Sequence, residues 1–507
     1  MAVAVLCIRL VVIALDATIV NVAVPTIASK LHASEDQLQW IVDGYTLTFS
    51  VLLLTCGHMA DRYGRQLGLI FGLILFGTGS TLATFAISPD QLIVWRAVMG
   101  AGAAFIMPAT LSSISHIFRD PHERSQALGL WSATLGIGAI LGPIVGGKLL
   151  QLYNWQSIFW VNVPIVMVGI ALVIPFVPNS RHTGPRADLI GLFISALGLI
   201  ALVWAIIEGP VQGWTSRPIL LALLLAATGI IAFVVWELRV TNPLVPMHFF
   251  RNMRFSMASA SISIAYFVLM GSLFLSTQYL QSILGNGPFA TGLRLVPEAA
   301  AIAVFSLISS LAVRHTGTKL VVAAGLLITG ASVWYLAHTT SSWSYIDILP
   351  ALIGLGAGIG TTMAPCEESV IGSLPQSQTG VGSSVNSTLI QIGSTLGVAV
   401  FGSLENSGFH SHMSAIPRLF HLPSSLSLMM EKSISATYAV ASKLGPAYVS
   451  AIKAMASRAF IHGMDNAMWI GMAVAAVAAT LALALLPSQH GSLVPDMVSD
   501  ASDAALE

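Results

Sequence analysis

Long apolar runs separated by short polar stretches recur along the whole chain. Each run is close to the roughly 20 residues that a helix needs to cross about 30 Å of hydrocarbon. This periodic pattern predicts fourteen membrane-spanning helices. Their expected ranges are 4–25, 40–57, 67–87, 91–113, 124–148, 158–177, 189–207, 218–237, 256–283, 291–312, 320–337, 346–365, 380–404 and 467–486. The count depends on dividing residues 189–237 at Gly209–Pro218 and on keeping the Gly/Ser-rich run 380–404 as one span.

The composition agrees with a polytopic membrane protein. Of the 507 residues, 55% are hydrophobic and only 9% are charged, and the mean hydropathy is +0.82. Soluble domains carry roughly 25% charged residues, so a chain with so few charges cannot cover a water-facing surface of this size. The 22 basic and 22 acidic residues cancel, which gives no indication of a nucleic-acid partner. The run Ala2–Pro25 is too long for a signal peptide and contains Asp16, so we expect it to be the first span.

The positions of lysine and arginine predict the orientation, because cytoplasmic loops carry more of them. With both termini in the cytoplasm, the short inner loops contain eleven basic residues: Arg62, Arg65, Arg119, Arg124, Arg181, Arg186, Arg239, Arg251, Arg254, Arg314 and Lys319. The short outer loops then contain four: Lys30, Lys148, Arg217 and Arg294. This bias predicts a multi-pass protein of the cell membrane with both termini cytoplasmic.

Glycine positions reveal a weak internal repeat. A shift of 255 residues superposes three glycines of one half on three of the other: Gly138, Gly142 and Gly147 on Gly393, Gly397 and Gly402. A similar shift places Gly100 and Gly102 near Gly356 and Gly358. Arg96 has no basic counterpart in the later half, which suggests a role other than packing. Repeated halves around a midplane site are the architecture of many secondary transporters.

The repeat predicts an all-α membrane protein built from two six-helix bundles with two inserted helices, fourteen spans in total. The first bundle is expected over residues 1–180 and the inserted pair over 181–240. The second bundle is expected over 241–486, with a long outer loop at 405–466. Residues 487–507 are expected to form a cytoplasmic tail.

A polar stretch between two apolar runs, Gly57–Gln66, reads GHMADRYGRQ. Its chemistry is dense, with an acid, two bases and two glycines: Asp61, Arg62, Arg65, Gly57 and Gly64. Glycine permits φ > 0 and the close approach of two helix ends. We therefore expect a tight inner turn whose ionic contacts open and close. The alternative is a loop whose arginines only set the topology.

Charges inside spanning helices cost about 3 kcal/mol at the centre on insertion scales, so each is a functional hypothesis. Four such residues occur: Asp16, Asp43, Arg96 and Glu298. Burial of a carboxyl group moves its protonation toward neutral pH. We expect Asp16 and Glu298 to bind a proton or cation, one in each half. The alternative is that Asp16 is a permanently paired structural charge, with Arg96 as a candidate partner, and a structural role is equally open for Asp43.

Other polar and aromatic residues of the spans are candidates for lining a substrate site near the midplane. They are Asn21, Tyr266, Tyr279, Asn386 and Gln391. The competing interpretation of the aromatic residues is packing or lipid contact.

No metal or other cofactor is expected. Cys7, Cys56 and Cys366 fit neither a disulfide framework nor a metal-binding spacing. The histidines of the expected outer loop, His410, His412 and His421, lack a nearby acid or thiol, so solvated loop residues are the better interpretation. The stretch Gly142–Leu149 is one residue from a phosphate-binding loop, but Leu149 replaces the hydroxyl that would hold Mg²⁺.

Four motifs, in order along the chain, resemble those of a known family: LDATIVNVAVPTI, GHMADRYGRQ, LIVWRAVMGAGAA and LGIGAILGPIVGGKL. The second is similar to the inner-loop signature of the major facilitator superfamily, and the third to its fourth-helix motif. The fourth resembles the fifth-helix motif of antiporters. The first resembles the first-helix motif of the fourteen-helix drug:proton antiporters, the QacA/EmrB type.

This resemblance implies alternating access driven by protons. It implies an inner gate at Gly57, Asp61, Arg62, Gly64 and Arg65, and a coupling base at Arg96. It implies an antiporter hinge at Gly138, Gly142, Pro143, Gly146 and Gly147. The chain departs from the expected pattern at Glu367 and Glu368, two acids after the twelfth span, where small or apolar residues are expected.

The function that these observations favour is proton-coupled efflux of small amphipathic or cationic compounds, such as antibiotics, by a chain that works as a monomer in the lipid bilayer. The alternative on the same fold is a proton-coupled symporter, or a transporter of lipids or metabolites. An integral-membrane enzyme is disfavoured, because no nucleophile–base or metal set converges at one membrane depth. A receptor or sensor is a further alternative, in which loop 405–466 binds a partner.

Overall fold

The computed structural model describes residues 2–117, 121–176, 188–375, 378–413, 433–443 and 446–488, together with Leu426 and Met430. Within these helices the side chains of Arg9, Asp61 and most of residues 111–140 lie outside the description. His421 and residues 489–507 of the expected tail also lie outside it.

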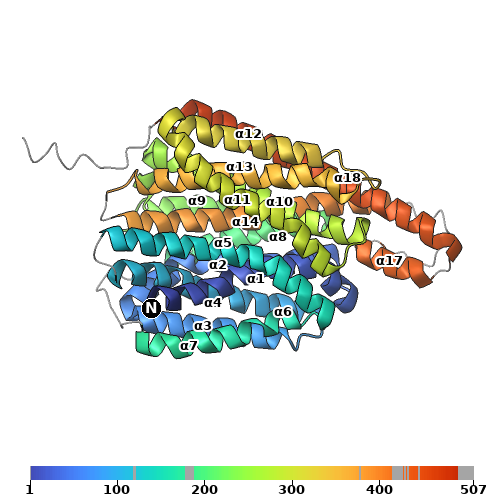
Figure 1. The fold of residues 1–507 in the computed structure, drawn as a ribbon, viewed down its shortest axis with the longest axis horizontal. Helices are drawn as coiled ribbons and strands as arrows, with labels where there is room; N and C mark the ends of the chain where they lie inside the picture. Colours follow the sequence, from blue (N-terminus) through green and yellow to red (C-terminus); the bar gives the residue numbers. More distant parts are fainter. Residues whose placement is uncertain are drawn as a thin grey trace, which may run out of the picture.

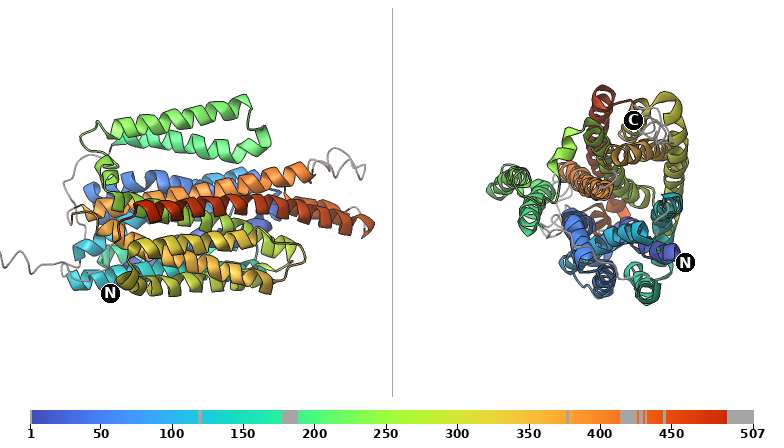
Figure 2. Two further views of the ribbon diagram at one scale, coloured as in Figure 1. Left: turned by 90° about the horizontal axis from the view of Figure 1, so that it is seen from above. Right: turned by 90° about the vertical axis from the view of Figure 1, so that its left-hand side faces the viewer.

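The first half of the chain forms seven helices: α1 (Ala2–Leu31), α2 (Glu35–Tyr63), α3 (Arg65–Ala83), α4 (Pro89–Ile117), α5 (Pro121–Leu152), α6 (Ser157–Trp160) and α7 (Asn162–Phe176). Two helices follow, α8 (Leu189–Gln212) and α9 (Arg217–Glu237). They pack against each other, because Gly198 of α8 and Gly229 of α9 allow a close backbone approach. In Figure 2 this pair stands beside the remaining helices.

The second half begins with a 3-10 turn, η1 (Met247–Arg251), and a helix, α10 (Met253–Gln278), which continues as a π-helical turn, η2 (Tyr279–Ile283). The remaining helices are α11 (Pro288–Thr316), α12 (Thr318–Leu336), α13 (Tyr345–Ile371), α14 (Thr379–Met413), α17 (Ile434–Lys443) and α18 (Pro446–Leu485). All regular elements in the described ranges are helical, as the sequence predicts.

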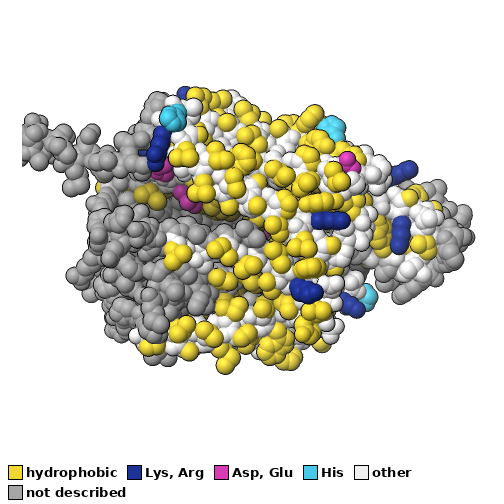
Figure 3. Space-filling model, in the orientation of Figure 1, with side chains coloured by type: hydrophobic (Ala, Val, Ile, Leu, Met, Phe, Trp, Pro, Cys, Tyr) yellow, Lys and Arg dark blue, Asp and Glu magenta, His cyan; other side chains and the backbone are white. Residues whose placement is uncertain are grey.

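Most helices run along the long axis of the molecule, so they form a bundle with two ends (Figure 1). We call these the Gly64 end, where α2 turns into α3, and the Glu35 end, where α2 begins. The visible face in Figure 3 is largely hydrophobic over the middle of the bundle, with charged side chains mostly toward its ends. A lipid-facing surface requires this distribution, since lipid tails cannot solvate charge.

Twelve helices of the described part are long and apolar enough to cross a membrane: α1, α2, α3, α4, α8, α9, α10 with η2, α11, α12, α13, α14 and α18. The apolar helix Ser157–Val173 is shorter than this criterion requires, and α5, whose side chains are only partly described, does not enter the count. The predicted count of fourteen spans is therefore not confirmed. The chain is a multi-pass membrane protein.

Several helices extend beyond their predicted limits. The tight turn predicted over residues 57–66 is much shorter, because α2 continues to Tyr63 and only Gly64 separates it from α3. The outer loop predicted over 405–466 is wrong in its bounds, since α14 reaches Met413 and α18 begins at Pro446. Likewise Glu367 and Glu368 lie within α13 rather than in a loop. Hydropathy marks where a helix leaves the apolar layer, whereas the backbone hydrogen bonds continue past that point.

The glycines that suggested the repeat make equivalent contacts in the two halves. In the first half Gly100 of α4 packs on the backbone of α2 and Gly102 on that of α3. In the second half Gly356 of α13 packs on α11 and Gly358 on α12. Small residues allow helix backbones to approach closely in lipid. The repeat therefore reflects shared helix packing.

Candidate functional site

A buried polar cluster joins four helices of the first half. Arg96 of α4 forms an ion pair with Asp16 of α1, and the two side chains are 1% and 0% exposed. Asn162, the first residue of α7, donates from Nδ2 to Asp16 Oδ1 at 3.0 Å and to Ser80 Oγ of α3 at 3.2 Å. Ser80 in turn donates to the carbonyl of Phe159 at 2.8 Å. The ion pair that was named as the alternative for Asp16 is therefore present, and proton binding by Asp16 stays a prediction.

Arg96 has two further contacts, both with α2. Its Nε donates to the carbonyl of Ile41 at 3.0 Å, and its guanidinium carbon lies 4.5 Å from the centre of the Tyr45 ring. Such a cation–π contact is strongest when it is desolvated. Gly100, one turn after Arg96, lets α4 approach the backbone of Tyr45 closely enough for these contacts. The guanidinium therefore has ligands besides Asp16.

Asp43 is near this cluster but separately bonded. Its side chain is fully buried, and Oδ1 accepts a hydrogen bond from Thr46 at 3.3 Å. Its Oδ2 has no hydrogen-bond partner among the described residues.

The predicted hinge glycines of α5 form the surface on which α1 packs. A methyl group on Gly142 would overlap Thr18 and lie 2.9 Å from the carbonyl of Leu15. Gly138 faces Ala14 in the same way, and Gly146 faces Ile19. The residues that they meet on α1 surround Asp16 in sequence. Helix α5 is therefore in direct contact with the segment that carries the buried acid.

The same helix also contacts the second half. A methyl group on Gly147 would lie 2.6 Å from the Cα of Phe289, at the start of α11. One on Gly292 of α11 would overlap the carbonyl of Pro143. Helix α5 therefore connects the surroundings of Asp16 with α11.

Glu298 also lies on α11 but forms no ion pair with any residue that the structure describes. Its side chain is 4% exposed, and Oε1 has no hydrogen-bond partner among the described residues. A methyl group on Gly356 of α13 would overlap the carbonyl oxygen of Glu298. The structure therefore places Glu298 and Asp16 in different halves, as predicted, but does not bring them into one cluster.

In the described part of the chain, side-chain hydrogen bonds connect the halves at the Glu35 end. Gln278 of α10 donates to Glu35 Oε1 at 2.7 Å, and Gln281 donates to the carbonyl of Val22 at 2.7 Å. Both are neutral amides that follow the last apolar turns of α10. These contacts hold the halves together at that end.

The predicted lining residues are dispersed. Asn21 and Asn386 are 3% and 5% exposed, and the Oδ1 atom of each has no hydrogen-bond partner among the described residues. Gln391 is half-buried on α14. Tyr266 is half-buried on α10, and its hydroxyl lies 3.6 Å from the sulfur of Met363 on α13.

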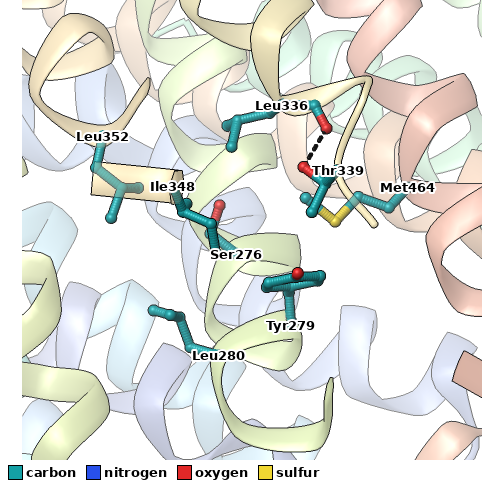
Figure 4. A pocket seen from close by; sticks show the side chains of 8 residues that line it. All are labelled: Ser276, Tyr279, Leu280, Leu336, Thr339, Ile348, Leu352 and Met464. Carbon is teal, nitrogen blue, oxygen red and sulfur yellow. Dashed lines mark hydrogen bonds between the residues drawn. The ribbon is translucent and has the colours of Figure 1, made fainter. Parts of the chain in front are cut away.

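Tyr279 has a different environment from the other lining candidates. Its hydroxyl donates to the carbonyl of Thr340 at 2.8 Å. Its ring lines a small pocket inside the second half, whose other walls include Ser276, Thr339 and Met464 (Figure 4). This pocket leaves no room for a water molecule. Here Tyr279 packs α10 against the connection between α12 and α13.

The predicted gate residues lie toward the Gly64 end, on the last turns of α2 and the first turn of α3. Gly64 has φ of 125° and ψ of 127°, a conformation that favours glycine. Gly57 lies within α2, and a methyl group on it would lie 3.2 Å from the side chain of Pro108 on α4. Arg62 and Arg65 flank the turn, and the Asp61 side chain lies outside the described residues.

No sequence motif marks Asn162 or Ser80 as functional residues. Neither is charged, and neither belongs to a motif. The available signal was a lone asparagine beside Pro164 in an apolar run, as in VNVP. Likewise no local pattern marks Glu35 of α2 or Glu405 of α14, because both lie at the ends of expected spans, where acids are common.

The comparisons with known proteins agree with this architecture. The Major Facilitator Superfamily pattern matches residues 6–398. The chain is 36% identical over 396 residues to "Multidrug resistance protein Stp" of Mycobacterium tuberculosis, covering 77% of this chain and 73% of that protein. It is 30% identical over 488 residues to "Multidrug efflux pump LfrA" of Mycolicibacterium smegmatis, covering 95% of each.

A solved structure shows the same fold. It is a bacterial homologue of the human lysosomal transporter Spinster, in an inward-facing and unoccupied conformation, with a TM-score of 0.64 and 16% identity. The match covers 96% of this chain and 97% of that one. From the matched pattern, the relatives and the fold together, we conclude that the chain belongs to the Major Facilitator Superfamily and is a membrane transporter rather than an enzyme.

Proposed function

We propose that this transporter exports small amphipathic or cationic compounds in exchange for protons, by alternating access. The observation that carries the proposal is the buried pair of Asp16 and Arg96, with Asn162 on the second carboxylate oxygen. The names of the relatives, a multidrug resistance protein and a multidrug efflux pump, support the substrate class.

Asp16 is the residue proposed to carry the proton. A proton on its carboxylate removes the charge that Arg96 neutralises, so the attraction between α1 and α4 weakens. Arg96 then keeps its contacts with Ile41 and the Tyr45 ring, which stabilise the cation while the pair is broken. Asp43 and Glu298 are further candidates for proton binding.

Helix α5 is proposed to pass this change to the second half. It touches α1 through Gly138, Gly142 and Gly146, and it touches α11 through Pro143 and Gly147. A small shift of α1 therefore moves a helix that belongs to the contact between the halves. Packed interfaces have discrete arrangements, so such a shift favours one of two states.

The turn at the Gly64 end is proposed to act as the inner gate. Its acid and its two bases, Asp61, Arg62 and Arg65, form ionic contacts that can be exchanged. The contact of Gly57 with Pro108 couples the end of α2 to α4, the helix of Arg96.

A cationic substrate is proposed to bind near Tyr266 and Glu367. Glu367 lies one turn after Met363 on α13, and the sulfur of Met363 is 3.6 Å from the Tyr266 hydroxyl of α10. An acid, a phenol and a thioether together suit an organic cation, since aromatic faces and carboxylates both attract positive charge. Asn21, Asn386, Gln391 and Tyr279 are weaker candidates.

We further propose that the chain is of the fourteen-helix drug:proton antiporter type. Helices α5 and α7 would then be the two spans that raise the count from twelve to fourteen. Helix α5 has 32 residues, and a helix of that size is about 48 Å long. The proposed parts are residues 1–180, 181–240, 241–486 and a tail, 487–507. The excess of arginine near the Gly64 end supports cytoplasmic termini and an outward-facing Glu35 end, for a single chain working as a monomer.

The test is ethidium transport in energised everted membrane vesicles that contain the Asp16→Asn variant. Asparagine keeps the shape of the side chain and one acceptor oxygen, but it carries no charge and cannot bind or release a proton. We expect loss of the proton-driven component, at least about tenfold in rate, which corresponds to about 1.4 kcal/mol. Asp36→Asn, at a partly exposed acid of α2, is the matched control and keeps the wild-type rate. Wild-type transport by Asp16→Asn contradicts the coupling role.

A further inference from the structure

A second group of buried acids lies where the two halves meet at the Glu35 end. Glu35 is 3% exposed at the start of α2, and Glu405 is 2% exposed on α14. Gln278 of α10 donates to Glu35 Oε1 at 2.7 Å. Glu405 lies at the same level of the bundle, because Gly402, one turn before it on α14, packs against Gln39, one turn after Glu35 on α2. One acid from each half is thus buried in the same contact.

The neighbouring helix turns bring a third polar group to this place. Gln39, one turn after Glu35, packs against Gly402 of α14. A methyl group on Gly402 would lie 2.6 Å from Gln39 Cδ. Gln39 is 0% exposed, and neither polar atom of its side chain has a hydrogen-bond partner among the described residues. The same is true of Glu405 Oε2.

The surrounding helices contribute further titratable groups. They are Asp36 on α2, His412 on α14, Asp465 and His462 on α18, Glu208 on α8 and Lys30 on α1. Helix α18 contacts α14 where Gly463 meets the backbone of Glu405. At the level of Glu35, α10 presents the neutral Gln278. Among the described residues no cation forms an ion pair with Glu35 or Glu405.

Two carboxylates buried together without a cation repel each other strongly, because the interior screens charge poorly. A proton on one of the two carboxyl groups removes the repulsion between them. The protonated group can then donate a hydrogen bond to a neighbouring acceptor that lacks a partner, such as Gln39 Oε1. We propose that Glu35 and Glu405 form a proton-binding site shared between the halves, and that its proton keeps the Glu35 end closed.

The sign of the pH dependence follows from where the proton is bound. The closed state holds the proton and the open state, with both acids in water, releases it. The closed population therefore rises as pH falls and declines as pH rises. This site differs from that of Asp16, which is paired with Arg96 in this structure, and it links closure to protonation. It deepens the proposed proton exchange, on which its role in the transport cycle rests.

The test measures the opening of the Glu35 end directly, without a transported compound. The full chain, with Cys7, Cys56 and Cys366 replaced by alanine, receives spin labels at Ser29→Cys on α1 and Ser342→Cys between α12 and α13, both exposed positions. Distances between the labels are measured by pulsed electron paramagnetic resonance in nanodiscs from pH 5.5 to 8.5. The expected result is a ratio of open to closed molecules that rises with pH, by at most about tenfold per pH unit for one linked proton.

The Glu35→Gln/Glu405→Gln double variant replaces both acids with neutral groups of the same shape. We expect it to stay closed, with less than a twofold change in that ratio over the same pH range. Glu405→Gln alone is measured as well, in case the double variant does not fold. It is expected to lose most of the pH dependence of the open-to-closed ratio. The control variants, Asp36→Asn and Glu208→Gln, are expected to keep the pH dependence of the wild type.

The proposal is overturned if the double variant, or Glu405→Gln alone where the double variant does not fold, responds to pH as the wild type does. It is also overturned if the wild type shows no response. Since the readout needs no substrate, its failure leaves the proposed efflux standing. Conversely, loss of coupling in Asp16→Asn leaves this measurement unaffected.

Discussion

Arg96 of α4 pairs with Asp16 of α1 at a point where neither side chain reaches solvent. Burying an ion pair costs several kcal/mol in lost hydration, and the attraction within the pair does not always offset it. Hydrophobic side chains would pack these helices at lower cost. The pair therefore argues for a role in switching, and its consequences can be measured.

Removal of the cation should destabilise the protein more than removal of both charges. Arg96→Met leaves Asp16 buried without its partner, which costs about 3–5 kcal/mol. Asp16→Asn/Arg96→Met removes both charges and is expected to recover much of this loss. Thermal unfolding in detergent gives the comparison. Equal losses in the single and double variants contradict a mutually dependent pair.

Asn162 is expected to hold the Asp16 carboxylate in place. Asn162→Ala removes the donor to Asp16 Oδ1 and to Ser80, which costs about 1–3 kcal/mol for a buried polar group left unsatisfied. Its matched control is Asn154→Ala, at an exposed position, for which about 0.5 kcal/mol or less is expected. Unfolding measurements on both variants check the difference, and an equal effect contradicts the assigned hydrogen bonds.

The packing of α5 on α1 should not tolerate a methyl group. Gly142→Ala places Cβ against Thr18 and 2.9 Å from the Leu15 carbonyl, so α5 must move away from α1. We expect efflux to fall by about tenfold or more while the protein still inserts. Gly380→Ala on α14 meets nothing within 4 Å, so it should be neutral or stabilise by about 0.5–1 kcal/mol. Full activity of Gly142→Ala refutes transmission through this contact.

Glu367 should discriminate substrates by charge. Glu367→Gln removes the negative charge beside Tyr266, so export of ethidium is expected to fall by about tenfold, whereas export of a neutral compound is retained. Glu368→Gln, at the adjacent exposed residue, is the control. A parallel loss for charged and neutral compounds argues for a structural role of Glu367 instead.

The charged residues of the spans and the repeated glycines could be predicted from the sequence. A charge in an apolar run is conspicuous because it is costly there, so the sequence alone marks Asp16 and Arg96 as candidates. Gly100 and Gly356 could be matched because close packing of helices restricts both positions to small residues.

Helix ends and neutral ligands could not be predicted as well. Helices α14 and α18 continue past the apolar layer, and hydropathy does not register that continuation. Asn162 and Ser80 become part of the site only because folding brings α3 and α7 beside α1. The contact of Glu35 with Gln278 joins residues 243 positions apart, a separation that no local pattern reports.

The most direct test of proton exchange is the direction in which protons move when the transported compound drives them. Proteoliposomes are loaded with ethidium, whose permanent charge prevents it from carrying a proton, and luminal pH is followed as ethidium leaves. Exchange predicts that the lumen becomes acidic with wild-type protein and stays unchanged with Asp16→Asn. A lumen that becomes alkaline, as in symport, or one that acidifies equally with Asp16→Asn, contradicts the account.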